Sequence, residues 1–263
     1  MRFKIGGYQI LLVLTIIGNS LIGYAQQAEA SRFTKLVWSD EFNTDGTPDA
    51  QKWGYDLGTG VDGWGNFELQ YYTSRPVNAI VKGGLLKIMA IRENFQGKEF
   101  TSAKLLSKNK YELKYGRVEI RAKLPVGIGT WPAAWMLGSN IDKVGWPACG
   151  ELDIMEGKGS EPNKIYGTLA YPGRFGGTAD GSTVLIKDAS SSFHTYGIEW
   201  TDTAVKISVD GKVYHTVKNT PDSPFNKNFY FILNLAMGGN FAGAVDPQLQ
   251  SATMEFDYIR VYQ

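Results

Sequence analysis

Residues 117–124 read RVEIRAKL. Apolar side chains stand at every second position of this stretch, with Arg, Glu, Arg and Lys between them. Because successive side chains of a β-strand point to opposite faces, this alternation places one face in a core and the other in water. Strands with one solvated face are typical of antiparallel sheets. The stretch therefore predicts an antiparallel sheet that covers a core with one face.

The sequence on both sides of this stretch carries similar short strands. From Leu36 onward, runs rich in β-branched and aromatic residues are separated by turns with glycine, and no long run keeps an apolar period of about 3.6 residues. Residues 204–209 and 212–217 alternate and are joined by Asp210-Gly211, which predicts a hairpin with a type I′ turn. About a dozen strands without a linker or repeat predict an all-β sandwich of two sheets in one domain, with a closed barrel as the alternative.

The composition narrows the classes of function. The chain has 263 residues, 43% of them apolar, with 27 basic against 26 acidic residues. It can therefore bury a core, and it has no charge excess that would favour nucleic acid or an anionic membrane as a partner. A single cysteine cannot form an internal disulfide, and with only two histidines it disfavours a zinc or copper site of the usual kind.

The N-terminus carries a targeting signal. Two basic residues precede an apolar run at residues 10–17, and Gly23-Tyr24-Ala25 follows as a small-x-small cleavage site, which is the order of a secretory signal peptide. We expect residues 1–25 to be this peptide, with Ala30 as the second choice of cleavage site and residues 26–35 as a short extension. The run is shorter than the roughly 20 residues of a membrane span, so a membrane anchor is the weaker alternative. The mature chain would be secreted or periplasmic, without a membrane span.

Residues 150–157, GELDIMEG, place three acids among apolar residues in an expected strand. Burying unpaired carboxylates costs free energy, so three of them in one strand indicate a function. On a regular strand Glu151 and Asp153 share one face, whereas Glu156 falls on the opposite face. A β-bulge at Ile154-Met155 would return Glu156 to the face of the other two. We therefore predict a bulge in this strand.

Such a bulge would give the carboxylates a catalytic geometry. If Glu151 and Glu156 lean toward each other over Asp153, their carboxyls approach to about 5 Å, the separation of retaining glycoside hydrolases. That mechanism needs one ionised carboxylate as nucleophile and one protonated carboxyl as acid and later base, and Asp153 between them can modulate both titrations. A solvated acidic strand or a calcium site is the alternative, but the interleaved Leu152 and Ile154 favour a half-buried strand.

Several tryptophans and one polar segment are candidates for sugar binding. Trp131 and Trp135 are four residues apart, so on a strand both indoles point the same way and could stack on pyranose rings. Trp64 and Trp146 lie in loops flanked by glycine, where exposure is expected. Residues 65–75, GNFELQYYTSR, combine amides, acids and tyrosines that could bind sugar hydroxyls. The alternative for the tryptophans is packing in the core. The alternative for residues 65–75 is a structural loop whose own polar side chains cap its backbone.

The acidic segment, residues 151–156, resembles the signature of glycoside hydrolase family 16. It has the form with one extra residue that the laminarinases and agarases of the family share and its lichenases lack. The resemblance covers the chain from about Leu36 to the C-terminus. Further segments agree in the same order: residues 38–42 (WSDEF), 68–75 (ELQYYTSR), 115–117 (YGR), 131–137 (WPAAWML), 146–150 (WPACG) and 256–262 (FDYIRVY).

The resemblance implies a catalytic domain at residues 36–263. Its fold would be a β-jelly-roll sandwich of two antiparallel sheets, of the concanavalin A kind, whose concave face forms an open substrate cleft. The activity would be endo-hydrolysis of a β-linked polysaccharide without a cofactor. In this family's scheme Glu151 would be the nucleophile, Asp153 its assistant and Glu156 the acid/base.

Within the family, the segments look most like bacterial laminarinases, which implies β-1,3-glucan as substrate and endo-1,3-β-glucanase activity. We expect a monomer. The residues expected to contact the substrate are Asn66, Glu68, Arg75, Trp131, Trp135 and Trp146. Many members carry a structural calcium, whose ligands here would be the Asp257 carboxylate and the carbonyls of Glu41 and Gly84. Two positions depart from the pattern, because Ala170 replaces the usual histidine and Phe241 a frequent tryptophan.

Three other functions remain as alternatives. A galactanase of the agarase kind shares the bulged motif, and a glucanase could also accept mixed β-1,3/1,4 linkages. A non-catalytic glucan-binding protein on the same scaffold is disfavoured, because such relatives typically lack one or both glutamates that this chain retains.

Overall fold

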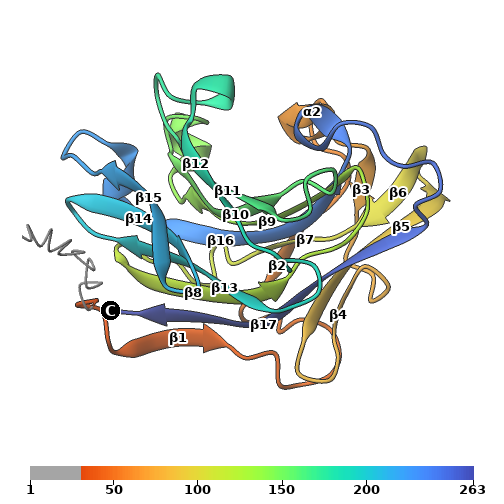
Figure 1. Ribbon diagram of the computed structural model, residues 1–263, viewed down its shortest axis with the longest axis horizontal. Helices are drawn as coiled ribbons and strands as arrows, with labels where there is room; N and C mark the ends of the chain where they lie inside the picture. The colour runs from red at the N-terminus through yellow and green to blue at the C-terminus, as the bar shows by residue number, and fades with distance from the viewer. Residues whose placement is uncertain (1–30) are drawn as a thin grey trace, which may run out of the picture. The chain divides into compact units, whose positions relative to one another are not determined.

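Two β-sheets make up the part of the chain that the computed structural model describes, residues 31–263 (Figure 1). The expected signal peptide and the alternative cleavage site at Ala30 lie outside the described residues. The larger sheet has ten strands in the order β15-β14-β13-β8-β17-β5-β6-β3, with β1 paired to β17 and β4 to β5. Its strands are β1 (Leu36–Asp40), β3 (Gln70–Tyr72), β4 (Ala79–Val81), β5 (Leu86–Phe95), β6 (Lys98–Ser102), β8 (Gly116–Lys123), β13 (His194–Trp200), β14 (Ala204–Val209), β15 (Lys212–Lys218) and β17 (Ser251–Tyr262).

The smaller sheet has seven strands in the order β12-β11-β10-β9-β16-β7-β2. Its strands are β2 (Gly54–Asp56), β7 (Lys104–Leu106), β9 (Thr130–Gly138), β10 (Glu151–Gly157), β11 (Lys164–Ala170), β12 (Asp180–Leu185) and β16 (Phe229–Met237). Short helical turns lie between strands: η1 (Gly63–Phe67), α1 (Ile141–Val144), η2 (Gly176–Thr178), η3 (Pro224–Asn226) and α2 (Gly239–Ala242).

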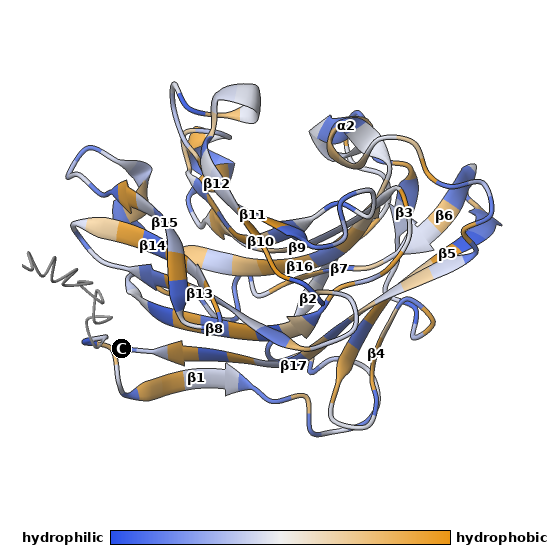
Figure 2. Cartoon of the chain, in the orientation of Figure 1, coloured by the Kyte–Doolittle hydropathy of each residue, from blue (hydrophilic) through white to orange (hydrophobic). Residues whose placement is uncertain are grey.

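Residues 117–124 form a strand with one buried face, as their alternation predicts. Along β8, buried and half-buried residues alternate without a break, and Figure 2 shows hydrophobic and hydrophilic residues alternating along β8 and β17. The pairs formed by these strands are antiparallel, which confirms the predicted sheet type. The predicted hairpin is also present between β14 and β15, where Asp210 and Gly211 have φ values of 49° and 75°, as a type I′ turn requires.

The core lies between the two sheets. It combines Ile120, Trp200 and Phe256 of the larger sheet with Leu152 and Phe231 of the smaller one, all of them almost completely buried. Two separate sheets around one core confirm the sandwich and exclude the closed barrel.

The structure has more strands than the sequence predicts, seventeen against about a dozen. The additional strands include β2, β3, β4 and β7, which have three residues each. A strand this short shows no measurable period, because an alternating pattern needs about four residues or more to be recognised.

The smaller sheet presents its outer face between two raised segments. The segment between β11 and β12 and the segment that contains α2 rise on opposite sides of this sheet (Figure 1). Strand β9 is the central strand of this sheet, with β10 and β16 on either side of it. Among residues 31–263, no helix combines the length and the apolar character that crossing a membrane requires.

Candidate active site

Strand β10 contains the predicted bulge. Glu151 and Asp153 pair with Leu137 and Trp135 of β9, and the register then shifts before Met155 and Glu156 pair with the next residues of β9. The pairing with β11 shifts over the same interval. Leu152, Ile154 and Met155 are completely buried toward the core. The one-residue slip thus turns Glu156 to the side of Glu151 and Asp153, as predicted.

The three acids line one cavity of about 810 Å³ on the outer face of the smaller sheet. Its walls come from β9, β10 and β11, from η1, from α1 and the loop that follows it, and from the two raised segments. The other residues that line it are Trp64, Gly65, Asn66, Trp131, Trp135, Leu137, Ile141, Trp146, Thr168, Ala170, Gly176, Gly177, Ala179, Asn240 and Phe241. A cavity of this size that joins carboxylates with aromatic side chains suits a ligand that is both hydroxylated and apolar on its faces.

Burial raises the pKa of all three carboxyls. The pKa of Glu151 rises to about 7, first because of burial and then because of the charge on Glu156, while neighbouring Trp146 and Lys104 lower it. The pKa of Glu156 also rises to about 7 through burial. Asp153 is raised well above its ordinary pKa by burial and by the two glutamates. Three acids this close titrate as a set, so the site retains protons at neutral pH.

Trp131 has a contact that the sequence did not predict. Its Nε1 donates a hydrogen bond of 2.9 Å to Oε1 of Glu156, and this bond lowers the pKa of Glu156 against the effect of burial. Its ring lies 4.8 Å from the ring of Phe241, centroid to centroid. Trp131 is therefore held by partners on two sides while it lines the cavity.

Four of the six residues expected to contact substrate line the cavity, namely Asn66, Trp131, Trp135 and Trp146. The residues that line it include neither Glu68 nor Arg75. Glu68 is 7% exposed and accepts hydrogen bonds from Gln70 Nε2 (2.6 Å) and Tyr72 Oη (3.3 Å).

Arg75 lies at a different place, beside strands β5 and β6. Its guanidinium pairs with Glu93, bonds Asn78 (3.1 Å) and Thr101 (3.0 Å), and lies over the ring of Phe95. The two terminal nitrogens of the side chain are thus bonded to protein groups, while its buried Nε has no hydrogen-bond partner among residues 31–263.

Trp64, which the sequence placed in an exposed loop, lines the cavity. Sequence reasoning missed a residue that supports the cavity. Asn234 of β16 supports it, because Asn234 Oδ1 accepts a 2.8 Å hydrogen bond from Trp135 Nε1 and Asn234 Nδ2 donates to Tyr72 Oη at 3.0 Å. The available signal was a lone amide within the otherwise apolar run 229–237.

Ala170 faces the nucleophile candidate directly. It pairs with Glu151 across β11 and β10, and it lines the cavity together with Gly176, Gly177 and Ala179. The position where the resembling family usually has histidine is therefore part of the site, and in this chain it contributes only a methyl group.

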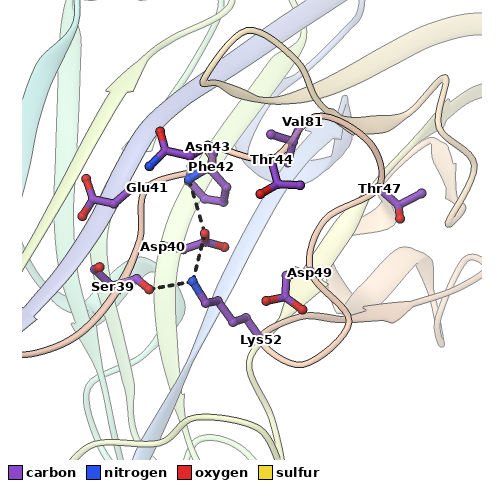
Figure 3. A pocket seen from close by; sticks show the side chains of 10 residues that line it. All are labelled: Ser39, Asp40, Glu41, Phe42, Asn43, Thr44, Thr47, Asp49, Lys52 and Val81. Carbon is purple, nitrogen blue, oxygen red and sulfur yellow. Dashed lines mark hydrogen bonds and ion pairs between the residues drawn. The ribbon is translucent and has the colours of Figure 1, made fainter.

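The residues expected to bind calcium lie on the larger sheet and next to it. Arg260 donates to both carboxylate oxygens of Glu41 (3.0 and 2.8 Å), and Arg121 pairs with Oδ2 of Asp257. Figure 3 shows Glu41 at the edge of a pocket of about 430 Å³ that Lys52 also lines. Among residues 31–263, no cluster of three or more His, Cys, Asp or Glu side chains could hold a metal ion.

The residues expected to bind calcium do carry oxygen atoms without a partner in the described part of the chain. Asp257 lies where the register between β17 and β8 shifts, so its backbone is locally irregular. Its Oδ1 stays outside the ion pair with Arg121. No described residue donates a backbone hydrogen bond to the carbonyl of Glu41 or of Gly84. Two carbonyls and one carboxylate oxygen are the kinds of ligand that calcium takes, so the chemistry of these donors suits the ion.

Comparison with known proteins finds a matching family and several similar proteins. The family described as glycosyl hydrolases family 16 matches residues 72–260. A β-glucanase of Rhodothermus marinus is 42% identical, over 96% of this chain and 93% of the relative. The crystal structure of the R. marinus laminarinase superposes with a TM-score of 0.83 at 43% identity and covers 87% of this chain and 97% of that one. A LamA variant of Z. galactanivorans in complex with laminaritriose and laminaritetraose has a TM-score of 0.81 at 39% identity, over 88% and 100% of the two chains.

Proposed function

This chain belongs to glycosyl hydrolases family 16, and on that premise we propose that it cleaves β-1,3-glucan internally, with retention of the anomeric configuration. The observation that carries the proposal is the bulged strand β10, which brings Glu151, Asp153 and Glu156 to one cavity. Relatives named β-glucanase and laminarinase, at 42% and 43% identity, support the choice of substrate.

The proposed reaction has two displacements. Glu151 attacks the anomeric carbon as a carboxylate while Glu156 gives its proton to the glycosidic oxygen, so the C–O bond breaks and a covalent glycosyl-enzyme forms. Glu156, now ionised, then takes a proton from a water molecule that attacks the same carbon and releases Glu151. Asp153 lies between them on β10, where burial and the two glutamates raise its pKa, so it keeps its proton and can donate a hydrogen bond to Glu151.

The environment of each glutamate suits its proposed role. Burial raises the pKa of Glu156 to about 7, so it can hold the proton that the leaving oxygen needs. Glu151 has the same raised pKa, and both glutamates have neighbours that favour the ionised form, Trp146 and Lys104 for Glu151 and Trp131 and Lys158 for Glu156. The assignment of the two roles therefore follows the family scheme and not the pKa values. At neutral pH one proton shared between the two glutamates gives the state in which one attacks and the other donates.

The aromatic side chains provide the binding surface. Trp131, Trp135 and Trp146 line the cavity and are half-buried or exposed, so part of each indole is open to a ligand. Sugar rings present apolar faces that stack on such indoles, and the Asn66 amide beside them can bind hydroxyl groups.

Three polysaccharides separate this proposal from its alternatives. The mature protein is incubated with laminarin, lichenan and agarose, and new reducing ends are measured. We expect the highest rate on laminarin, with products of several sizes from the start because cleavage is internal. Activity on agarose alone would refute the proposal in favour of a galactanase, and binding without cleavage would indicate a glucan-binding protein.

Retention is tested separately by proton NMR of early products. The β-anomer should appear first and then mutarotate. An α-anomer appearing first would mean inversion and would refute Glu151 as a covalent nucleophile.

We also propose that one structural calcium binds at Asp257, with the carbonyls of Glu41 and Gly84 as further ligands. The free Oδ1 of Asp257 and the two available carbonyls support this site. Calcium added to chelator-treated protein should raise the unfolding temperature of the wild type and leave that of Asp257→Ala unchanged. An equal increase in both proteins would place the ion elsewhere.

For the N-terminus we propose export with removal of residues 1–25, on the order of basic, apolar and small residues described above. Mass spectrometry of the exported protein should give a chain that begins at Gln26. A chain beginning at Ser31 would support the second cleavage site instead, and an intact N-terminus would contradict export by this signal.

A further inference from the structure

The loop of residues 58–67, here called the rim loop, has an unusual backbone. Asp62, Trp64 and Phe67 have φ values of 47°, 59° and 56°. Side chains other than glycine rarely adopt this left-handed region, because Cβ approaches the following carbonyl oxygen. Such a backbone persists only where its surroundings hold it in place. Because Trp64 and Asn66 of this loop line the cavity, what holds the loop also shapes the proposed substrate site.

The Trp64 ring packs near Tyr72, at 5.8 Å between centroids, and against a buried ammonium group. Nζ of Lys104 lies 4.0 Å from the centre of the Trp64 ring and 5.5 Å from that of the Trp135 ring. Lys104 is 8% exposed, so its charge is removed from water almost completely. The attraction between a cation and an aromatic face strengthens when the cation is desolvated. Lys104 thus joins the rim loop to strand β9 through the two indoles.

The position of Lys104 is itself fixed by its neighbours. Strand β7 lies between β2 and β16, and Lys104 pairs across them with Asp56 and Asn234. Its Nζ forms an ion pair of 3.1 Å with Asp56 Oδ2, which compensates a charge that would otherwise be costly to bury. Asn234 in turn bonds Trp135, so the lysine and the indole on which it acts share one support.

The mechanism proposed above does not require this lysine to touch the sugar. Its side chain is not among those that line the cavity, and its known partners are protein groups. Its charge favours the ionised form of Glu151 from outside the cavity lining, and also that of Glu68, the residue that directly follows the rim loop. A buried cation at the base of a strained loop therefore has a role other than direct binding.

We propose that Lys104 is a positioning residue that fixes the rim loop beside the cleft, so that Trp64 and Asn66 are held ready for the sugar chain. The part of this proposal that concerns substrate depends on the proposed glucanase function, and the part that concerns the loop does not. The tests below address the two parts separately.

The first test needs no sugar and follows amide hydrogen exchange in the rim loop. The amides of Trp64, Gly65, Phe67 and Glu68 bond carbonyls of the same loop, so they report its closure. In Lys104→Met, which keeps the length of the side chain and removes its charge, these amides should exchange at least about tenfold faster, while those of β8 and β17 keep their wild-type rates. Lys104→Arg should restore slow exchange, since a guanidinium also binds aromatic faces.

Lys108→Met is the matched control. Lys108 lies two residues beyond β7, pairs with the exposed Asp142 and lies 5.7 Å from the Tyr230 ring, outside the cavity. Its removal should leave both the exchange of the rim loop and the activity unchanged. Unchanged exchange of the rim loop in Lys104→Met would overturn the proposal. Equally accelerated exchange in the loop and in β8 would overturn it too, because the lysine would then be a general stability residue.

The second test measures hydrolysis of laminarin. A loop that contacts the sugar equally before and during the reaction changes KM more than kcat. We expect Lys104→Met to raise KM about tenfold. Its kcat should also fall, because the charge of Lys104 favours the ionised form of Glu151, and Lys104→Arg should restore both constants. A change in kcat alone would overturn the proposed role. If the wild type does not cleave laminarin, the glucanase function fails, while the exchange experiment still decides whether Lys104 holds the loop.

A second variant covers the case in which Lys104→Met does not fold. Trp64→Leu removes the aromatic partner from the loop side and leaves β7 intact. The same four amides should exchange faster in this variant, and unchanged rates would overturn the proposal as well.

Discussion

The Nε1 atom of Trp131 donates its hydrogen bond to Oε1 of Glu156 while the same indole lines the cavity. A hydrogen bond to a carboxylate favours the ionised form, so this contact lowers the pKa of Glu156 against the rise caused by burial. One side chain is therefore in a position to bind the sugar and to tune the proposed proton donor.

Trp131→Phe separates these two roles, because phenylalanine keeps a ring and lacks the N–H group. The pKa of Glu156 should rise, so the donor keeps its proton to higher pH and the alkaline limb of the kcat profile moves upward. Trp135→Phe is the control, since Trp135 bonds Asn234 and not an acid. The assignment fails if the alkaline limb of Trp131→Phe coincides with that of the wild type.

The roles of the two glutamates can be separated with an activated substrate. Dinitrophenolate leaves without protonation, so Glu156→Ala should still release a burst of it from a dinitrophenyl β-laminaribioside. The same variant should cleave laminarin at least about 100-fold more slowly than the wild type. Glu151→Ala should lose both reactions. Release is measured by stopped-flow absorbance. A burst from Glu151→Ala would show that Glu156 is the nucleophile and Glu151 the acid/base.

Asp153 should make the fold less stable at high pH. The pKa of Asp153 in the folded state lies above its ordinary value. Its contribution to the free energy of unfolding is therefore fully present below pH about 3.8, and it is lost as the pH rises through the raised pKa. Asp153→Asn should therefore raise the unfolding temperature at pH 8, by about 2–4 °C if about 1 kcal/mol is gained, and by less at pH 4. Calorimetry at both pH values tests this, with the exposed Asp202→Asn as the control. A larger gain at pH 4 would contradict the expectation.

Asn234 should matter for both stability and binding. Asn234→Leu leaves the partly buried Nε1 of Trp135 without its acceptor, which should destabilise the protein by about 1 kcal/mol and raise KM for laminarin as the indole loses its fixed orientation. Tyr72→Phe removes the partner on the other side of Asn234 and keeps the bond to Trp135. It should lower stability with KM near that of the wild type. Equal KM values in the two variants would exclude a positioning role for Asn234.

The features that depend on local periodicity could be predicted from the sequence. Alternation in residues 117–124 predicted the sheet type, and Asp210-Gly211 predicted the hairpin. The bulge was predictable because a regular strand would turn Glu156 away from the other two acids, and both flanking pairings show the shift.

The supports of the site could not be predicted, because they depend on which strands become neighbours. Lys104, Asn234 and Trp135 come from β7, β16 and β9, which are far apart in the chain and adjacent in the sheet. Periodicity gives the face on which a side chain lies and not the strand beside it. The polar segment at residues 65–75 shows a related limit, since composition does not reveal that Glu68 and Arg75 bond protein groups.

The register shift in β10 allows the strand to lose one residue at the bulge. Removing Met155 would close the slip and leave Glu156 an even number of positions from Glu151, so a regular strand would still turn all three acids outward. Removing a residue between Glu151 and Asp153 would instead send one acid into the hydrophobic interior. Natural or designed shortening of this segment is therefore expected at Ile154-Met155, where it leaves the outward-facing side chains as they are.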